Sequence, residues 1–179
     1  MGMDSRRLSQ RAIQPGHDRT FRASEQNFIA ALETLLRPSG QWDIVDHPRD
    51  LERIFGNRYG VVPEAKITYL PTGRYMYFEV KKQGPQGNAE ERAAKHHTVQ
   101  FYKTLAEVTG FDYHPFVTVM CESLSTLDRY TIKHPYYFEE GHYFNWVDYD
   151  LDSLAAFIDE IASRWLAGPG DGKPQQIPE

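Results

Sequence analysis

The chain has 179 residues, of which 40% are hydrophobic and 25% are charged, which is typical of one globular domain and excludes a disordered chain. A single cysteine, Cys121, excludes an internal disulfide framework and a thiolate cluster for zinc. The net charge of −5 argues weakly against a nucleic-acid partner. The charge is uneven, however, because residues 81–103 hold five basic residues against two acidic ones, which permits local phosphate binding.

The two ends of the chain differ in composition from the middle. Residues 1–20 are polar and lack periodicity, which predicts a flexible arm, and residues 168–179 are low in apolar residues, which predicts a disordered tail. Residues 21–167 are therefore expected to form one domain. No apolar run approaches the roughly 18 residues of a membrane span, and the N-terminus lacks the apolar segment of a signal peptide. We expect a cytoplasmic protein with no membrane partner.

The first half of the chain predicts four elements. Apolar side chains recur at helical spacing between Phe28 and Leu36, which predicts a first helix with Ser24 as its N-cap. Two β-rich runs separated by the turn sequence PTG predict a β-hairpin. Between the helix and the hairpin we expect a short strand and a short helix. The four elements are expected at residues 24–36, 42–45, 49–55 and 61–81.

The second half predicts a charged helix closed by Gly110, a short buried strand, an aromatic-rich segment with one or two strands, and a last amphipathic helix. These elements are expected at residues 88–108, 115–121, 129–147 and 151–166. The order of helices and strands along the chain predicts an α/β domain with a mixed central β-sheet flanked by helices.

Two acids and a lysine are expected to meet in the hairpin. Glu79 and Lys81 are two residues apart in a strand, so their side chains share one face while Phe78 and Val80 point into the core. Across the hairpin, Glu64 can lie near Glu79. Paired carboxylates repel each other, and a hard cation such as Mg²⁺ relieves this repulsion while a nearby lysine offsets charge on a phosphate. A cross-strand ion pair on a solvated sheet face, of about 0.2–1 kcal/mol, explains the same residues.

The sequence GNAEER at 87–92 opens the charged helix and has two interpretations. Asn88 is a suitable N-cap, and Glu91 three residues later nearly completes a capping box. The same side chains suit DNA bases, because Asn pairs with adenine, Arg with guanine, and Glu accepts from an exocyclic amine. Helix rules alone favour the capping interpretation.

The histidines show no metal-ligand spacing. His96 and His97 are adjacent and face different directions on a helix, so they cannot form a pair of ligands four residues apart. We interpret them, with His134 and His142, as surface, packing or phosphate-contacting residues. The aromatic run Tyr136–Trp146 is interpreted as core or dimer interface and not as a platform for stacking bases.

Taken together, these motifs resemble the EcoRI/MunI branch of type II restriction endonucleases, within the PD-(D/E)xK nuclease superfamily. GNAEER fits the G-N-A-x-E-R recognition motif of that branch. FEVKKQ at 78–83 fits its E-x-K strand, and VVPEAKI at 61–67 fits its P-D segment. Further similarity occurs in ASEQNF at 23–28, PFVTV at 115–119 and YYFEEGHYFNW at 136–146, so it spans most of residues 22–150.

The resemblance implies a restriction-endonuclease-like core and specific catalytic roles. Glu64 takes the place of the first metal-binding acid, and Glu79 that of the second. The carbonyl of Val80 is implied as a third ligand, Lys81 as the catalytic lysine, and Glu25 as an auxiliary acid. Glu64 departs from the family, which usually has Asp at this position, and the extra methylene can change the metal geometry.

The resemblance also assigns the DNA-reading residues. Those on the recognition motif, which reads an inner AATT in this branch, are Gly87, Asn88, Ala89, Glu91 and Arg92. Gln86 stands where MunI-like enzymes carry an arginine that helps to read the outer base pair. Only the AATT core of the target is therefore expected here.

From the resemblance we expect a homodimeric type II restriction endonuclease that cuts double-stranded DNA at a short palindrome. Mg²⁺ is the expected cofactor, with Mn²⁺ able to substitute. A companion DNA methyltransferase for the same site is expected, but not as a physical partner. Two alternatives stay open: a repair or junction nuclease of the same fold without base specificity, and a catalytically impaired, sequence-specific DNA-binding protein.

Overall fold

A five-stranded mixed sheet forms the centre of the computed structural model, which describes residues 21–56, 59–82, 88–122 and 132–168. The strand order is β1-β2-β3-β4-β5, with β1, β2 and β3 antiparallel and β3, β4 and β5 parallel. The strands are β1 (Trp42–Asp46), β2 (Ala65–Tyr69), β3 (Arg74–Lys82), β4 (Phe116–Glu122) and β5 (Tyr143–Val147). The predicted mixed sheet is confirmed.

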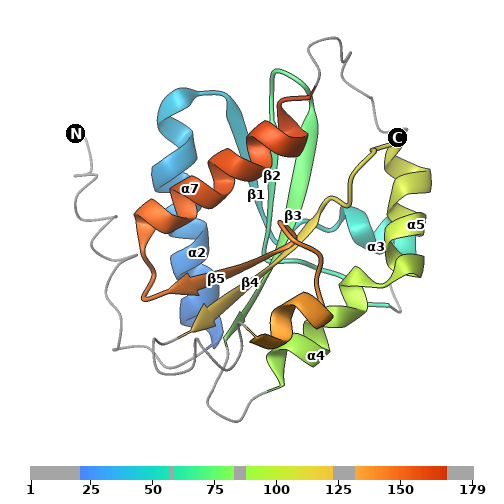
Figure 1. Cartoon of the computed structure of the whole chain (residues 1–179). Coiled ribbons are helices and arrows are strands. Elements are labelled where there is room, and N and C mark those ends of the chain that lie inside the picture. Colours follow the sequence, from blue (N-terminus) through green and yellow to red (C-terminus); the bar gives the residue numbers. More distant parts are fainter. Residues whose placement is uncertain (1–20, 57–58, 83–87, 123–131, 169–179) are drawn as a thin grey trace.

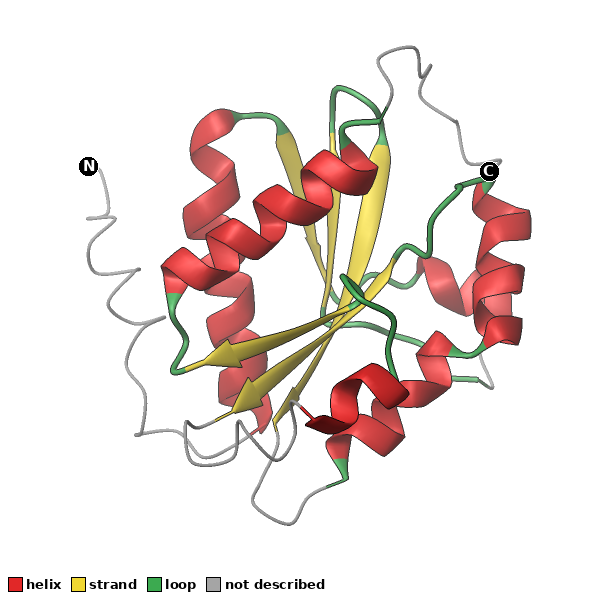
Figure 2. Cartoon of the chain, viewed as in Figure 1, coloured by secondary structure: helices red, strands yellow, loops and turns green. Residues whose placement is uncertain are grey.

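Helices cover both faces of this sheet (Figure 1). One face carries α2 (Phe21–Leu36) and α7 (Leu151–Ile161), and the other carries α3 (Asp50–Phe55), α4 (Ala89–Ala94) and α5 (Val99–Thr109). The carboxyl ends of the parallel strands lie together at one edge, near the start of α2 and beside α4 (Figure 2). Among the described helices, none combines the length and the apolarity that crossing a lipid bilayer requires.

Strand β3 contributes to both hydrophobic cores because its side chains alternate between the two faces. Phe78 and Val80 pack in the core beneath α2 and α7. Tyr75 and Tyr77 pack in the core beneath α3 and α5. Residue 79 therefore belongs to the second face, as the sequence predicts.

One helix that the sequence predicts is wrong. Residues 88–108 do not form a continuous helix but α4, a 3₁₀ turn η2 (Lys95–His97) and α5. Thr98 separates them, because it is extended (φ −71°, ψ 154°) and its side chain accepts a hydrogen bond from the Phe101 N–H, which caps α5. Helix α5 then ends at Gly110, whose φ of +66° is left-handed, as predicted.

The first helix also begins earlier than predicted. It starts at Phe21, so Ser24 is not its N-cap but a buried residue inside it, with Oγ 2.9 Å from the Tyr149 hydroxyl. The other predicted elements are confirmed within a few residues, and the last helix continues from α7 into a π-helical turn, η4 (Ala162–Leu166). In the aromatic segment, β5 follows a short 3₁₀ turn, η3 (His134–Tyr136). The predicted arm, 1–20, and residues 169–179 of the predicted tail lie outside the described residues.

Candidate active site

Glu64 and Glu79 lie opposite each other across the β2–β3 hairpin. Ala65 pairs with Phe78, and the Glu64 N–H donates to the Phe78 carbonyl at 2.9 Å, which places Glu64 next in register against Glu79. The Glu64 carboxylate reaches across the strands, because its Oε2 accepts a hydrogen bond from the Val80 N–H at 2.6 Å. Glu64 is 8% exposed and Glu79 is 6% exposed. The interpretation as a solvated surface ion pair is therefore wrong.

Both carboxylate oxygens of Glu79 have a nitrogen partner. Lys81 Nζ lies against Oε1, and His96 Nδ1 lies against Oε2. Burial by itself raises the pKa of Glu79, but the contacts with His96 and Lys81 outweigh burial and hold this pKa below its ordinary value. Glu79 is therefore ionised at neutral pH although it is almost completely buried.

Glu64 shows the opposite behaviour. Burial raises the pKa of its carboxyl group to about 7, and the negative charge of Glu79 adds to this rise. The Val80 N–H and the Lys81 charge offset only part of the effect. The cost of ionising Glu64 comes first from burial and to a smaller extent from repulsion by Glu79. A cation bound between the two carboxylates would offset both, since its positive charge favours the ionised form of each carboxylate.

The donor set fits a hard divalent cation. Within the part of the chain that the structure describes, no group of three or more His, Cys, Asp or Glu side chains is arranged to hold a metal. An ion between Glu64 and Glu79 therefore needs further ligands from the backbone, from water or from a phosphate. This mixture of one or two carboxylates with other oxygens is what Mg²⁺ prefers. The main-chain group closest in sequence to Glu79 on the side of Lys81 is that of Val80, which lies between these two residues on β3.

The contribution of Glu64 to stability should fall with rising pH. The unfolded chain ionises this group near pH 4.5 and the folded chain near pH 7, so its contribution to folding is lost as pH rises through this window. In EDTA, the unfolding free energy of the wild type, relative to Glu64→Gln, should fall by roughly 2–3 kcal/mol between pH 5 and pH 8. Urea titrations at both pH values measure this difference. Equal pH dependence in the two proteins would refute it, and the exposed Glu140→Gln is the control.

Glu25 lies in the first turns of α2 (Phe21–Leu36). It is half-buried, beside Ser24, whose hydroxyl ties this end of the helix to Tyr149 after β5. Figure 1 shows the start of α2 near the carboxyl ends of β4 and β5.

The predicted DNA-reading residues fall around the start of α4. Gln86 and Gly87 lie outside the described residues. Asn88 precedes α4 and is exposed, and its side chain makes no capping hydrogen bond, so the capping box favoured by helix rules does not form. Glu91 and Arg92 are also exposed. The helix thus starts without using the Asn88 side chain.

The opposite side of α4 anchors it to the sheet. Ala89 and Ala93 are buried against Met120 of β4 and against Phe138. Glu90 is also buried, and its Oε1 lies 3.8 Å from Lys133 Nζ. Because this side is fixed, α4 presents its exposed residues from a defined position.

No protein-family model and no curated protein matches the chain. Among solved structures, the chain is similar to the MunI restriction endonuclease in complex with cognate DNA. The TM-score is 0.53 at 18% sequence identity, and the match covers 77% of this chain and 95% of that chain. The chain has the fold of the MunI restriction endonuclease. The predicted restriction-endonuclease-like core is therefore confirmed.

In this MunI-like fold, His96 lies against Glu79 and so belongs to the candidate site, although nothing in the sequence indicated this. The interpretation of the histidines as surface residues is wrong for His96, His134 and His142, which are buried, whereas the packing interpretation is right. Burial also lowers the pKa of His97 to about 2, so this ring is neutral and offers no charge to a phosphate. The contact of His96 with Glu79 depends on how α4 and η2 fold back on β3, which no local pattern predicts.

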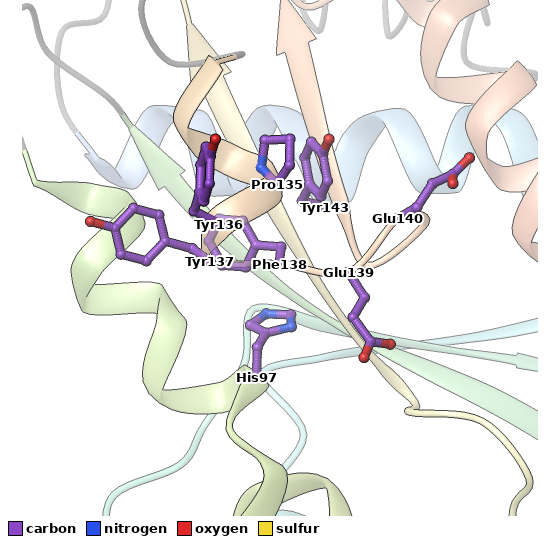
Figure 3. A pocket seen from close by; sticks show the side chains of 8 residues that line it. All are labelled: His97, Pro135, Tyr136, Tyr137, Phe138, Glu139, Glu140 and Tyr143. Atoms are coloured by element: carbon purple, nitrogen blue, oxygen red, sulfur yellow. The ribbon is translucent and has the colours of Figure 1, made fainter.

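A pocket of about 510 Å³ lies beside His97, against aromatic side chains of η3 and β5 (Figure 3). Phe138 is buried and packs edge-on against His97 at 4.8 Å, whereas Tyr136 is 87% exposed. Glu139 and Glu140 also line the pocket, and their charges disfavour a nucleic-acid ligand. The pocket is not lined by Glu64, Glu79 or Lys81. The candidate site of this MunI-like chain is therefore the part of the sheet that carries these three residues, and not this pocket.

Proposed function

We propose that the protein is a Mg²⁺-dependent endonuclease that makes double-strand cuts in DNA at a short palindrome containing AATT. The observation that carries the proposal is the acid pair Glu64 and Glu79, with Lys81 in contact, on the central hairpin of a fold shared with MunI. The MunI structure is a complex with cognate DNA. Buried paired carboxylates beside a lysine suit phosphodiester hydrolysis better than a purely structural role.

Each catalytic side chain has a distinct role in this proposal. Glu64 and Glu79 hold Mg²⁺, or Mn²⁺ in its place, together with the carbonyl of Val80. When bound, the cation supplies positive charge beside the phosphate and acidifies a water molecule. Lys81, held by Glu79, offsets negative charge that develops on the scissile phosphate. Glu25 approaches the same sheet edge from α2 as an auxiliary acid.

Base reading is assigned to the start of α4. Asn88, Glu91 and Arg92 are exposed there, and Ala89 holds the helix against the sheet. Gln86 and Gly87 complete the recognition segment. Because this segment directly follows β3 in the chain, the residues that read bases and the residues that cut are joined by a short connection.

A homodimer is proposed because a two-fold symmetric protein matches a palindromic target. Ile132 is 72% exposed and Tyr136 is 87% exposed, and large exposed apolar side chains at neighbouring positions suit a subunit interface. Residues 21–167 act as one nuclease domain in this proposal. A methyltransferase of the same specificity protects the host DNA without binding the nuclease.

Digestion of a plasmid of known sequence tests the proposal. Mg²⁺ should give discrete fragments, and sequencing of the fragment ends should find AATT at each cut, with 5′-phosphate and 3′-hydroxyl termini. Ca²⁺ and EDTA serve as controls without cleavage. A smear, or a preference for junctions, would indicate a nuclease without base specificity. Binding to AATT duplexes without any cleavage in Mg²⁺ would indicate an impaired DNA-binding protein.

A further inference from the structure

We propose that His96 is a positioning residue that holds the Glu79 carboxylate in place and links it to α4. This inference rests on the proposed nuclease function, in which Glu79 is a metal ligand. The turn η2, Lys95–His97, follows α4 without a break and folds back onto the sheet. From this turn, His96 contacts Glu79 of β3 and His97 contacts Thr118 of β4, and we call the pair the histidine clasp.

The ring of His96 is fixed on the side away from Glu79. His96 is 5% exposed, and its ring packs against Phe101 at 5.2 Å and against Phe116 at 4.9 Å between ring centroids. Between these two aromatic rings, Nδ1 of His96 lies against Oε2 of Glu79 as a close ion-pair contact. Lys81 Nζ lies against the other oxygen, Oε1, so each carboxylate oxygen of Glu79 contacts one nitrogen.

The backbone of His96 is fixed as well. Its carbonyl accepts a hydrogen bond from His114 Nε2 at 2.8 Å. His114 is itself buried, and its ring stacks on Phe116 at 6.1 Å with an interplanar angle of 19°. Both the ring and the main chain of His96 therefore depend on one rigid aromatic cluster, which suits a residue that orients another side chain.

The second residue of the histidine clasp, His97, contacts β4 at the position that pairs with Glu79. His97 Nε2 lies 2.7 Å from Thr118 Oγ1, and Thr118 of β4 pairs in register with Glu79 of β3. Two consecutive residues of η2 thus bind two neighbouring strands beside the acid pair. The position of α4 relative to Glu79 is consequently fixed through side-chain contacts and not only through the chain connection.

The physical role of His96 follows from the burial of Glu79. A buried, ionised carboxylate oxygen that loses its only polar neighbour is left in an apolar environment, which is costly, and the carboxylate can then rotate away from the position that a metal requires. Residues that orient metal ligands typically change metal affinity or activity by about 10–100-fold when they are removed. Packing alone would give no such effect, because an apolar side chain of similar size fills the same space.

Two substitutions separate positioning from packing. His96→Leu keeps an apolar body against Phe101 and Phe116 but removes the contact with Glu79. His96→Asn carries a side-chain amide nitrogen near the place of Nδ1, so it can restore the contact. Phe157→Leu is the control, because Phe157 is also buried and stacks on Phe144 at 4.6 Å in the core on the other face of the sheet.

We expect His96→Leu to lower the single-turnover cleavage rate in Mg²⁺ and the calorimetric affinity for Mn²⁺ by about 10–100-fold. Its affinity for an AATT duplex in Ca²⁺ should change less than either quantity, and His96→Asn should recover most of both losses. Phe157→Leu should leave both quantities unchanged. An active His96→Leu variant, or a His96→Asn variant as impaired as His96→Leu, would overturn the positioning role. Thermal unfolding confirms that each variant is folded.

A spectroscopic measurement separates this inference from the proposed function. In metal-free protein, the ¹⁵N resonance of His96 Nδ1 should move in Glu79→Gln and stay in place in the exposed variant Glu160→Gln. An unchanged resonance in Glu79→Gln would overturn the contact itself, whether or not the protein cuts DNA. A protein that shows the shift but does not cleave DNA in any metal would overturn the nuclease function and leave the contact standing.

Discussion

Glu79→Gln and Lys81→Met are each expected to lower the rate of Mg²⁺-dependent DNA cleavage by about 10³-fold or more, while DNA binding in Ca²⁺ persists. Both substitutions keep the volume of the side chain and remove its charge. Glu79→Gln removes half of the negative charge that holds the cation, and Lys81→Met removes the positive charge that faces the phosphate. Each change thus acts on the chemical step and leaves the recognition surface of α4 in place.

Single-turnover cleavage of an AATT-containing duplex, with enzyme in excess, measures this effect. Glu160→Gln removes an exposed carboxylate on α7 and serves as the control for a loss of charge. Circular dichroism and thermal unfolding check that the variants are folded. If either charge-removing variant keeps a rate within about tenfold of the wild type, the assignment of the acid pair and Lys81 is wrong, because removing a group that stabilises charge in the transition state typically costs about 10²–10³-fold.

Asn88→Ala is expected to weaken binding to an AATT duplex by about 1–3 kcal/mol for each lost bidentate contact, without lowering the stability of the fold. Weaker DNA binding without a loss of stability is expected because the Asn88 side chain makes no capping hydrogen bond, so its removal costs the helix no hydrogen bond. Binding to a duplex without AATT should be almost unchanged, since contacts with phosphates carry that affinity. Fluorescence anisotropy in Ca²⁺ with both duplexes measures the difference.

Thr98→Ala is the matched control for the Asn88 experiment. Thr98 does cap a helix, because its Oγ1 accepts from the Phe101 N–H at 3.2 Å, so its loss should cost about 1 kcal/mol of unfolding free energy. Asn88→Ala should cost less than about 0.5 kcal/mol. A stability loss in Asn88→Ala equal to that of Thr98→Ala, with no change in discrimination between the duplexes, would restore the capping interpretation.

The sequence predicted the sheet and the acid pair because both depend on local rules. Alternation along residues 74–82 and the turn at PTG define the hairpin, and the hairpin register then places Glu64 opposite Glu79. The family resemblance added the roles of these residues and the expected fold. That fold is the one found in MunI.

What the sequence missed depends on contacts between distant segments. Ser24 has the side chain of an N-cap, but its hydroxyl is buried against Tyr149, 125 residues away. Thr98 breaks a helix that helical periodicity alone would continue, because its side chain caps the following segment. His96 reaches Glu79 only after α4 has packed on β4, so its place in the site is a property of the tertiary structure.

The hairpin that joins β2 and β3 also bears on the order in which the chain folds. Its two strands are linked by four residues, whereas β4 begins more than thirty residues after β3 ends, so closing the hairpin loses much less chain entropy. We therefore expect Glu64 and Glu79 to become neighbours through a fast, local event, while both carboxylates are still solvated and repel each other only weakly. The larger cost, the burial of Glu64, arises only later, when slower long-range docking covers the hairpin.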